Sequence, residues 1–318
     1  MKRGGRAHDT AGPPMSAGIK TFMRPEALDI CLQSLLNFNW HEVIVADDNP
    51  AAFREDYEKV YGKYSQRLPL TVLPLEPDSG LAAGRNRIAD WCSSDYILML
   101  DDDQTVHGGL AAMMQVLDED ARVGGVSSLL SEPGGVRCSA SNLYLEGAFV
   151  IKEIRNYPNL QRTSHGYRYV VLDLIPNATL FRRECLATSA WDPNYKIGRE
   201  HLDFYLTHKQ LGRWIFAVCL DASIRHDTHL GEGEYRGFRR GERVAASDAY
   251  FRRKFGVRGT AEGKQLIGGQ QVFTRLRSLG APVPWARGGA RLWHGLGRRS
   301  PLRRLSRRKR DKELPWGL

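Results

Sequence analysis

The sequence predicts an α/β fold with a mostly parallel central sheet flanked by helices, and two observations support this prediction. Apolar stretches typical of strands alternate with stretches of helical periodicity through the first 120 of the 318 residues. The stretch at 96–100 is apolar throughout, as expected of a strand that is buried on both faces. Four strand-then-helix units in succession favour a parallel sheet with helices on both sides.

Each element of the first half has its own signal. A short apolar strand covers 19–22, and a helix follows from Pro25, because proline fits the first helical turn and apolar residues then recur at helical spacing. The β-rich stretch 42–46 stops at the turn sequence DDNP. Asp78 and Ser79 are candidate caps for the third helix. The remaining predictions are a helix at 52–66, a strand at 70–73, a helix at 80–91 and a strand at 96–100.

The second half is less regular, and no internal repeat is present. A stretch rich in Gly, Glu and Arg at 231–241 predicts a mobile loop. Strands are predicted at 123–130, 144–151, 169–174 and 214–218, a short helix at 181–187, and longer helices at 200–211 and 244–255.

Composition narrows the class of protein. Hydrophobic content of 42% fits a globular chain with a core, and no stretch of 18 apolar residues predicts a transmembrane helix. The first residues are basic and lack the apolar stretch of a secretory signal, which predicts a disordered leader over 1–16. Five scattered cysteines without a CxxC pair argue against a zinc ribbon and a disulfide framework, and favour a reducing, cytoplasmic location.

The net charge of +10 belongs to the two ends of the chain. Residues 287–318 carry +9 and residues 1–16 carry +2, so the body between them carries −1. A nucleic-acid enzyme more often spreads basic residues through its body, so a nucleic-acid partner is not expected. Leucines and a tryptophan interleave with arginines in the basic tail, which suits an anionic membrane surface; a disordered soluble tail is the alternative.

Polar clusters follow three of the predicted strands. These are Thr21 to Arg24, Asp47 with Asp48, and Asp101 to Asp103. In parallel α/β sheets, ligands bind outside the carboxyl ends of the strands. The three clusters are therefore expected to converge on one edge of the sheet.

The aspartate triplet is the firmest candidate site. Three adjacent carboxylates repel one another, and a cation relieves that repulsion. Carboxylate oxygens suit Mg²⁺ or Mn²⁺, which would neutralise a diphosphate leaving group. A solvated acidic turn is the simpler interpretation of any Asp triplet, but the buried strand before Asp101 favours a metal and diphosphate site.

Three further segments are candidates for chemistry. Gly80 allows a close approach to a ligand and Arg85 can face a phosphate, although a glycine turn followed by a solvated arginine is equally consistent. Glu200 and Asp203 share one helical face, where a carboxylate can deprotonate an acceptor or simply complement the helix dipole. His226 is a candidate metal ligand, although a lone histidine is more often structural.

The order of these motifs resembles glycosyltransferase family 2 and its relatives with the GT-A fold. The opening 21–25 is similar to the first strand and helix of that family, and the stretch ending at Asp48 is similar to its uridine-binding strand end. Residues 80–86 resemble its G…ARN helix, 101–103 its DXD motif, and 198–204 its acceptor-site helix. The stretch 80–103 also resembles β-1,4-N-acetylgalactosaminyltransferases. The resemblance covers about residues 17–230.

This resemblance implies an inverting, metal-dependent transfer from a nucleotide sugar, most often a UDP-sugar, to a hydroxyl of a glycan or lipid-linked acceptor. Asp47 would contact the uracil and Asp101 the ribose or base, while Asp103 and His226 would hold Mn²⁺ or Mg²⁺. The acidic pair of the family reads Glu200-His201 here, so the expected base is Glu200, then Asp203, then His201. The other expected donor-binding residues are Thr21, Arg24, Asp48, Gly80, Arg85 and Asp102, the last being exposed.

The expected organisation is a leader at 1–16, a catalytic domain at 17–230, an extension at 231–286 and a basic tail at 287–318. The catalytic domain would divide into a nucleotide-binding half, 17–120, and an acceptor half, 121–230. The location would be cytoplasmic, at the inner face of the membrane if the tail binds there. A nucleotidyltransferase is one alternative, but the glycine-rich basic loop it needs after the first strand is missing from 21–25. A basic nucleic-acid-binding protein is the other.

Overall fold

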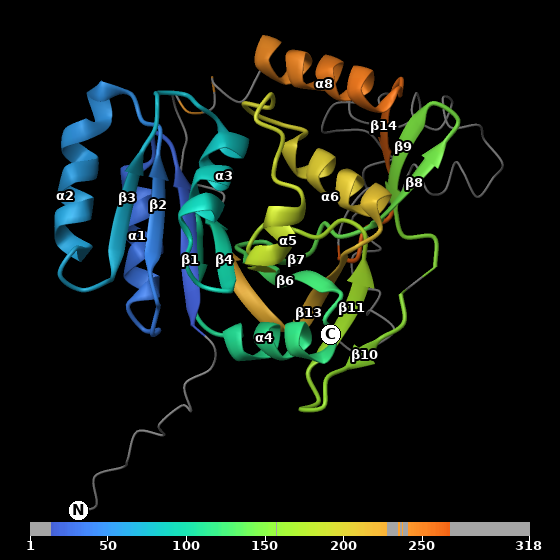
Figure 1. The fold of residues 1–318 in the computed structure, drawn as a ribbon, viewed down its shortest axis with the longest axis horizontal. Helices are drawn as coiled ribbons and strands as arrows, with labels where there is room; N and C mark the ends of the chain where they lie inside the picture. Colours follow the sequence, from blue (N-terminus) through green and yellow to red (C-terminus); the bar gives the residue numbers. More distant parts are fainter. Residues whose placement is uncertain (1–13, 157, 228–234, 236, 238–240, 268–318) are drawn as a thin grey trace, which may run out of the picture.

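The structure, a computed structural model, describes residues 14–156, 158–227, 235, 237 and 241–267. Within them an 11-stranded mixed sheet has the strand order β10-β11-β13-β6-β12-β4-β1-β2-β3, with β5 on β13 and β7 on β6. A second sheet has the order β14-β9-β8. The strands of the first sheet run through the middle of the molecule with helices on both sides, which confirms the predicted fold class (Figure 1).

The first half consists of the four predicted strand-then-helix units. Strands β4, β1, β2 and β3 lie side by side and parallel, as predicted. The elements are β1 (Met15–Thr21), α1 (Pro25–Leu35), β2 (Val43–Asp47), η1 (Ala51–Phe53), α2 (Arg54–Tyr64), β3 (Leu70–Pro74), α3 (Leu81–Trp91), β4 (Tyr96–Asp101), β5 (Gln104–Val106) and α4 (Leu110–Glu119). Because β1 already begins at Met15, the last two residues of the predicted leader belong to the sheet.

The predicted caps of α3 are wrong. The helix begins at Leu81 after Gly80, and neither Asp78 nor Ser79 caps it through a side-chain hydrogen bond. Gly80 has a φ of 96°, and a Cβ on it would lie 2.6 Å from the Cα of Lys196. The close approach of a second segment therefore sets the start of this helix, and a local capping motif could not reveal it.

The second half adds strands on the other side of β4. Strand β12 (Thr179–Arg182) runs antiparallel between β4 and β6 (Val123–Glu132), and β13 (Ile215–His226) is parallel to β6. The prediction of a helix at 181–187 is therefore wrong for its first two residues, which belong to β12, and correct for the rest, which form α5 (Arg183–Thr188). Hydrogen bonds to two neighbouring strands outweigh the local helical pattern there. The other elements are β7 (Gly135–Arg137), β10 (Gln161–Arg162), β11 (Arg168–Leu172) and α6 (Glu200–Leu211).

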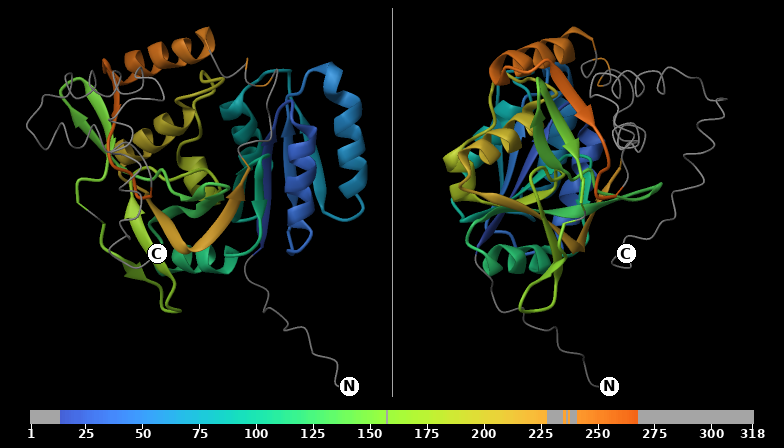
Figure 2. Two further views of the ribbon diagram at one scale, coloured as in Figure 1. Left: turned by 180° about the vertical axis from the view of Figure 1, so that it is seen from behind. Right: turned by 90° about the vertical axis from the view of Figure 1, so that its right-hand side faces the viewer.

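The second, small sheet joins a strand near residue 260 to two strands of residues 142–153. The single strand predicted at 144–151 is a hairpin of β8 (Asn142–Glu146) and β9 (Phe149–Glu153), with Gly147 at a φ of 54° in its turn. Strand β14 (Gly259–Glu262) pairs in parallel with β9. Helix α8 (Glu242–Phe255) precedes β14 and lies across the α6 side of the molecule (Figures 1 and 2).

Two large hydrophobic clusters lie on the two faces of the large sheet, and a small third cluster with Ile151 and Ala261 belongs to the second sheet. Helices α1, α2 and α4 supply one cluster, and α3, α5 and α6 supply the other. All five cysteines are buried and free, as the absence of a disulfide framework predicted. The two clusters fix the sheet between helices, so that its carboxyl edge is left for the polar residues.

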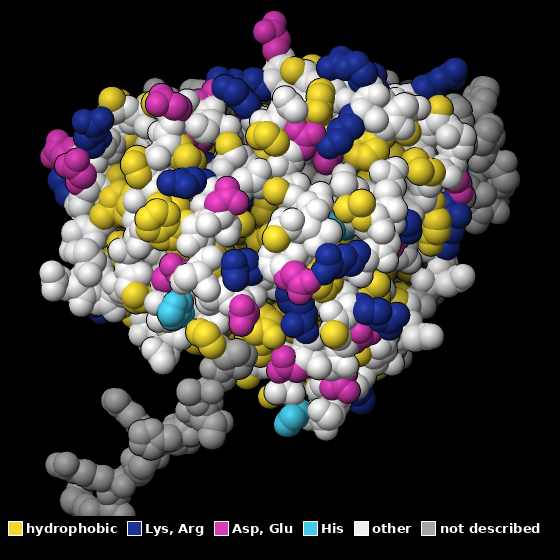
Figure 3. Space-filling view, viewed as in Figure 1, with side chains coloured by type: hydrophobic (Ala, Val, Ile, Leu, Met, Phe, Trp, Pro, Cys, Tyr) yellow, Lys and Arg dark blue, Asp and Glu magenta, His cyan; other side chains and the backbone are white. Residues whose placement is uncertain are grey.

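Among the described residues no helix is long and apolar enough to cross a membrane. The face seen in Figure 3 mixes basic and acidic side chains instead of gathering one sign. The predicted basic tail, most of the predicted leader and most of the predicted mobile loop at 231–241 lie outside the described residues.

Candidate active site

The polar clusters meet at the carboxyl edge of the sheet, as the strand-end argument predicted. The register pairs Lys20 of β1 with Asp101 of β4, and Thr21 of β1 with Asp47 of β2. Because the strands are parallel, the residues that follow them emerge side by side. Arg24, only three residues beyond β1, consequently contacts the aspartates that follow β4.

Asp102 is buried inside this edge, contrary to the expectation that it is exposed. Its relative exposure is 0%. One oxygen accepts hydrogen bonds from the hydroxyl of Thr21 at 2.8 Å and the amide of Phe22 at 3.4 Å, and the other pairs with Arg24. Burial raises the pKa of Asp102 to about 6, although Arg24 opposes the shift. Asp102 and Thr21 therefore support the site from within, and neither is placed to touch a donor.

Two arginines supply positive charge to the triplet. Arg24 pairs with Asp102 through Nη2 and with Oδ2 of Asp103 at 2.6 Å through Nη1. Arg85 pairs with Oδ1 of Asp101 at 2.7 Å and is itself only 2% exposed. The repulsion among the three carboxylates is thus relieved in part by the protein, so the triplet alone does not require a metal.

Asp101 is held on both sides. Arg85 binds one carboxylate oxygen, and Nδ2 of Asn177 donates a hydrogen bond of 2.8 Å to the other. Burial alone would raise its pKa, but the charge of Arg85 lowers the pKa of Asp101 to about 2. The side chain retains 21% exposure, so an ionised, oriented carboxylate faces outward from the end of β4.

Asp103 and His226 face each other across neighbouring strands. Strand β5 pairs with the end of β13, and the amide of Asp227 donates a hydrogen bond to the Asp103 carbonyl at 2.9 Å. Nε2 of His226 lies 3.7 Å from Oδ1 of Asp103, an oxygen that is buried without a hydrogen-bond partner among the described residues. Nδ1 of the same ring lies 2.8 Å from Glu132, and Asp103 and Glu132 both raise the pKa of His226.

This pair fits part of a divalent metal site. Ligand atoms bound at about 2.1 Å to an octahedral ion lie about 3 to 4 Å apart, which the separation of the Asp103 oxygen and the His226 nitrogen satisfies. In the described part of the chain no group of three or more His, Cys, Asp or Glu side chains is arranged to hold a metal. Mg²⁺ is often bound through one or two carboxylates and completes its shell with substrate phosphates and water, so a pair with the single carboxylate of Asp103 is compatible with such an ion.

Asp47 and Asp48, at the end of β2, differ in their exposure and in their partners. Asp47 is partly exposed and accepts hydrogen bonds from Tyr61 at 2.6 Å and from Asn49. Asp48 is 1% exposed; one oxygen pairs with buried Lys20 and the other accepts the Gly80 amide at 2.9 Å. Asp48 is therefore placed to fix the turn before α3, and the expectation that it contacts the donor is revised.

Glu200 begins α6 and points toward Arg85. Its Oε1 lies 3.8 Å from Nη1 of Arg85, and the residue is 6% exposed. The two residues before it, Gly198 and Arg199, have φ values of 75° and 73°. A left-handed backbone costs a residue such as arginine about 1 to 2 kcal/mol, and strain of this kind is typical of functional sites.

The other two candidate bases are less well placed. Both oxygens of Asp203 are engaged, since Tyr195 donates a hydrogen bond of 2.9 Å to Oδ2 and Lys254 donates one of 2.9 Å to Oδ1, and the residue is 2% exposed. Nε2 of His201 lies 2.7 Å from the Ile175 carbonyl, so this nitrogen carries the proton. Burial, together with the charge of Arg85, lowers the pKa of His201 to about 4. Glu200 remains the best-placed base.

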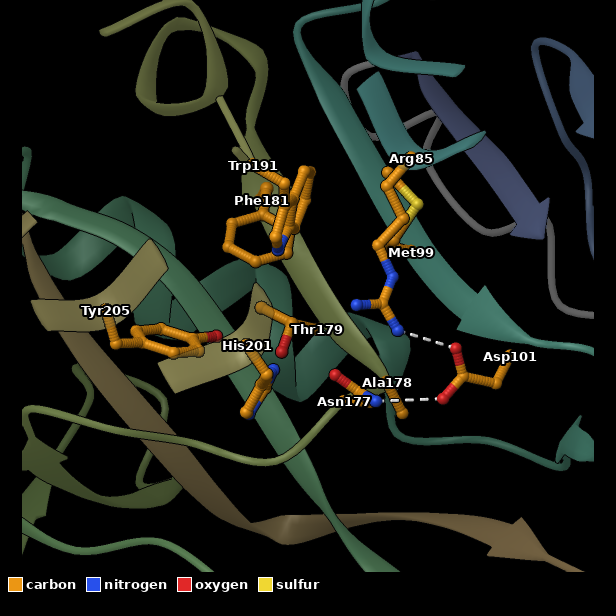
Figure 4. A pocket seen from close by; sticks show the side chains of 10 residues that line it. All are labelled: Arg85, Met99, Asp101, Asn177, Ala178, Thr179, Phe181, Trp191, His201 and Tyr205. Atoms are coloured by element: carbon orange, nitrogen blue, oxygen red, sulfur yellow. Dashed lines mark hydrogen bonds and ion pairs between the residues drawn. The ribbon is translucent and has the colours of Figure 1, made fainter. Parts of the chain in front are cut away.

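A small pocket lies between Asp101 and α6 (Figure 4). Arg85 and Asn177 reach Asp101 from different directions, and His201 and Trp191 line the pocket further along. Its cavity volume of about 10 Å³ is the room that one water molecule needs. The guanidinium of Arg85 also lies 5.7 Å from the Trp191 ring centre, so α3 and the loop before α6 meet here.

The sequence reasoning missed Asn177, Lys20 and Glu132. Each contacts a residue that was predicted: Asn177 contacts Asp101, Lys20 contacts Asp48, and Glu132 contacts His226. Lys20 stood inside an apolar strand and Asn177 followed Pro176, two weak signals that something specific was placed there. Glu132 carried no signal, because the contact depends on the pairing of β6 with β13.

The parallel half-sheet, the strand-end aspartates and the antiparallel β12 match the GT-A fold of glycosyltransferases. The chain belongs to glycosyl transferase family 2, whose profile matches residues 16–188. The amylovoran biosynthesis glycosyltransferase AmsE of Erwinia amylovora is 30% identical over 82 residues. That stretch covers 25% of this chain and 30% of the relative, so the similarity spans under a third of the curated protein.

Solved structures show the same fold. The structure of S. aureus TarS 1–349 in complex with UDP-GlcNAc is similar with a TM-score of 0.51 and 14% identity, covering 74% of this chain and 65% of that one. GalNAc-T7 with UDP, GalNAc and Mn²⁺ is similar with a TM-score of 0.52 and 13% identity, covering 69% and 44%. At these identities the similarity establishes the fold alone.

Proposed function

We propose that this chain is an inverting, metal-dependent glycosyltransferase that moves a sugar from a UDP-sugar to a hydroxyl of a glycan or lipid-linked acceptor. The observation that carries the proposal is the position of Arg85 between two carboxylates. It holds Asp101, at the end of β4, at 2.7 Å, and its other nitrogen lies 3.8 Å from Glu200. Only the side chain of Arg85 therefore separates the candidate base, Glu200, from the strand ends, where ligands bind in such sheets.

The donor would lie along the carboxyl edge of β1, β2 and β4. Asp47, partly exposed, retains acceptor capacity for an N–H of the uracil, since each carboxylate oxygen accepts more than one hydrogen bond. Asp101 would receive the ribose hydroxyls, because its carboxylate is ionised and fixed in orientation. TarS carries UDP-GlcNAc in its structure and GalNAc-T7 carries UDP, which supports a uridine nucleotide as donor.

The leaving diphosphate needs positive charge as the sugar departs. Asp103 and His226 would hold the divalent ion, Mn²⁺ or Mg²⁺, and the ion would stabilise the negative charge that develops on the diphosphate. Glu132 orients the His226 ring through Nδ1, as second partners of ligating histidines commonly do. Arg24 neutralises the oxygen of Asp103 that faces away from His226 and keeps that carboxylate in place.

Glu200 would remove the proton from the acceptor hydroxyl as the hydroxyl attacks the anomeric carbon. The carboxylate is buried, and Arg85 compensates part of its charge. His201 stays neutral at neutral pH, because burial and Arg85 hold its pKa near 4, and it would shape the site without transferring a proton. Positioning of the two reactants and charge stabilisation supply most of the rate enhancement in such a site.

A panel of nucleotide sugars tests the proposal. The full chain is incubated with UDP-glucose, UDP-galactose, UDP-GlcNAc or UDP-GalNAc and Mn²⁺ or Mg²⁺, and released UDP is measured. We expect turnover with at least one UDP-sugar, and loss of about 10² to 10⁴ in kcat for Glu200→Gln with unchanged UDP affinity. Full turnover in Glu200→Gln would exclude Glu200 as the base. The preferred sugar also decides between a hexosyl- and an N-acetylhexosaminyltransferase.

The location is part of the same proposal. We propose a cytoplasmic enzyme whose basic tail, 287–318, carries +9 and binds an anionic inner membrane face. Flotation of the full chain with phosphatidylserine-containing vesicles tests this, with phosphatidylcholine vesicles and a chain lacking 287–318 as controls. Equal flotation of the shortened chain would contradict the role of the tail.

A further inference from the structure

Helix α8 packs over the segment that leads into α6 and therefore over the position of Glu200. Figure 1 shows α8 crossing above α6, and the two elements are joined by side-chain contacts. Only Ser247 and Phe251 of this helix are buried. Phe251 joins the hydrophobic core, and Tyr250 and Phe255 pack against it. Apolar packing therefore explains how one face of the helix is held, but it does not explain the polar contacts that the helix makes.

The backbone immediately before Glu200 is in an unfavourable conformation. Gly198 and Arg199 are both left-handed, with φ values of 75° and 73°. Glycine adopts such a φ freely, but arginine does not. A left-handed arginine persists only where surrounding contacts hold it, and it directs the side chain that follows.

The side chain of Arg199 makes those contacts with two later elements. Its Nε pairs with Asp248 of α8, and its Nη1 donates a hydrogen bond of 3.0 Å to Thr260 of β14. Its guanidinium also lies 5.7 Å from the centre of the Phe251 ring. Three points on α8 and β14 therefore fix the residue whose backbone aims Glu200.

Two further contacts from α8 bracket Glu200. On the amino-terminal side, the hydroxyl of Ser247 donates a hydrogen bond of 2.8 Å to the Ile197 carbonyl. On the carboxyl-terminal side, Lys254 lies 2.8 Å from Asp203, one helical turn after Glu200. The amide of Asp203 in turn donates a hydrogen bond of 2.8 Å to the Arg199 carbonyl. The base is held from both sides of its own turn.

The Arg199–Asp248 pair gives little stability by itself. The Arg199 side chain is 24% exposed and the Asp248 side chain 40% exposed, and half-exposed ion pairs contribute weakly to folding. Its placement next to the base matters more, because catalysis is far more sensitive to sub-ångström displacement than stability is. The Arg199–Asp248 ion pair adds little to folding stability but lies next to the candidate base, so its role is better explained by catalysis than by stability.

We propose that Arg199 and Asp248 are positioning residues that hold Glu200 in the geometry for deprotonating the acceptor. The inference rests on the proposed function, in which Glu200 is the base. Asp248 acts through Arg199, and Arg199 acts through its left-handed backbone. Neither residue touches the donor, so their loss lowers kcat and leaves nucleotide affinity unchanged.

Three variants and a matched control test the inference. Asp248→Ala removes the ion pair, Asp248→Asn keeps a hydrogen-bond acceptor, and Arg199→Gly keeps the left-handed backbone accessible while removing both side-chain contacts. Glu184→Ala is the control, because it removes the exposed pair that Glu184 of α5 forms with Arg213, outside the site. Each variant is assayed for kcat with the UDP-sugar that the wild-type chain turns over fastest, for UDP affinity by calorimetry, and for melting temperature.

We expect kcat to fall about 10- to 100-fold in Asp248→Ala and Arg199→Gly, the loss typical of a displaced catalytic group. Asp248→Asn should retain an intermediate kcat, because its amide oxygen still accepts from Arg199. UDP affinity should stay within about twofold, and the melting temperature should fall by no more than about 2 to 4 °C, as for the loss of a weak pair. Glu184→Ala should match the wild type in kcat.

Two results would overturn the inference. One is wild-type kcat in both Asp248→Ala and Arg199→Gly; the other is a parallel loss of kcat and UDP affinity, which indicates a general distortion of the site. If Asp248→Ala does not fold, the kcat and UDP affinity of Asp248→Asn and Arg199→Gly are compared with those of the wild type instead. Glu200→Gln separates this inference from the proposed function. If Glu200→Gln keeps full turnover, Glu200 is not the base and the proposed mechanism fails. If Glu200→Gln is inactive while Asp248→Ala and Arg199→Gly are both fully active, only the positioning role fails.

Discussion

Asn177 donates a hydrogen bond from Nδ2 to Oδ2 of Asp101, at 2.8 Å, from the segment directly before strand β12. Arg85 binds the other oxygen of the same carboxylate at 2.7 Å. A carboxylate held at both oxygens keeps one rotamer and one charge state, and both properties matter if it is to receive ribose hydroxyls. The contact therefore makes Asn177 part of the proposed donor site.

Replacement of Asn177 should weaken nucleotide binding. Asn177→Asp places a second carboxylate against Asp101, and we expect UDP affinity to fall about tenfold, which corresponds to about 1.4 kcal/mol. Asn177→Ala removes the hydrogen bond without adding charge and should give a smaller loss. Calorimetric titration with UDP measures both, with exposed Asn156→Ala as control. Equal affinity in Asn177→Asp and wild type would show that Asp101 does not contact the nucleotide.

The metal assignment depends on Asp103 and His226, whose facing atoms are 3.7 Å apart. We expect Asp103→Asn and His226→Ala each to lower Mn²⁺ affinity at least tenfold when UDP is present, because each removes one of two protein ligands. Titration of Mn²⁺ followed by electron paramagnetic resonance measures the free ion directly. Asp120→Asn is the control, since Asp120 pairs with Arg122 away from this edge. Unchanged Mn²⁺ binding in both site variants would exclude this pair as the metal site.

Because Lys20 and Asp48 form a buried ion pair, we expect the removal of one partner to lower the free energy of unfolding. Both side chains are almost fully buried, at 2% and 1% exposure, and the stem of Lys20 lies against Gly84 of α3. Lys20→Met leaves a buried carboxylate without its partner, and removal of one member of such a pair typically costs about 3 to 5 kcal/mol. Urea denaturation measures the free energy of unfolding. A loss below about 1 kcal/mol would show that Asp48 finds another partner; Lys59→Met, on the surface, is the control.

His201 predicts part of the pH dependence of stability. Its pKa is about 4 in the folded chain, against 6.5 as the ordinary value, so between these values the unfolded chain binds a proton that the folded chain does not. Stability should therefore be complete above pH 6.5 and fall as the pH decreases, by about 2 kcal/mol between pH 7 and pH 5 from this residue. His201→Gln, which can still donate to the Ile175 carbonyl, should reduce that decrease. An identical decrease in both proteins would contradict the prediction.

Much of the first half of the fold was predictable, because its strands and helices carry strong local patterns. The convergence of Thr21, Asp47 and Asp101 also followed from the sequence, since parallel strands end at one edge. Strand β12 was not predictable in the same way. Its last two residues look helical together with those that follow, and hydrogen bonds to β4 and β6 make them part of a strand.

The contacts of the site join residues that lie far apart along the chain, and no local sequence pattern predicts such contacts. Asp102 was expected to be exposed, but Arg24 and Thr21 enclose it from another strand end. The distinction between Glu200 and Asp203 as base depended on Lys254, which arrives from α8 near the end of the described chain. Sequence reasoning therefore found the residue types and their edge of the sheet, whereas the division of labour among them required the tertiary contacts.

The pairing of β5 with β13 has a consequence for how ligands would bind. It sets Gln104 opposite His226, so backbone hydrogen bonds fix the spacing of Asp103 and His226, and no flexible loop intervenes. Such a site is preorganised: the entropy of bringing the two groups together is lost when the sheet folds, and little further ordering is needed on binding. Amide hydrogen exchange along 104–106 and 224–226 should accordingly be slow in the free chain and should change little when nucleotide is added.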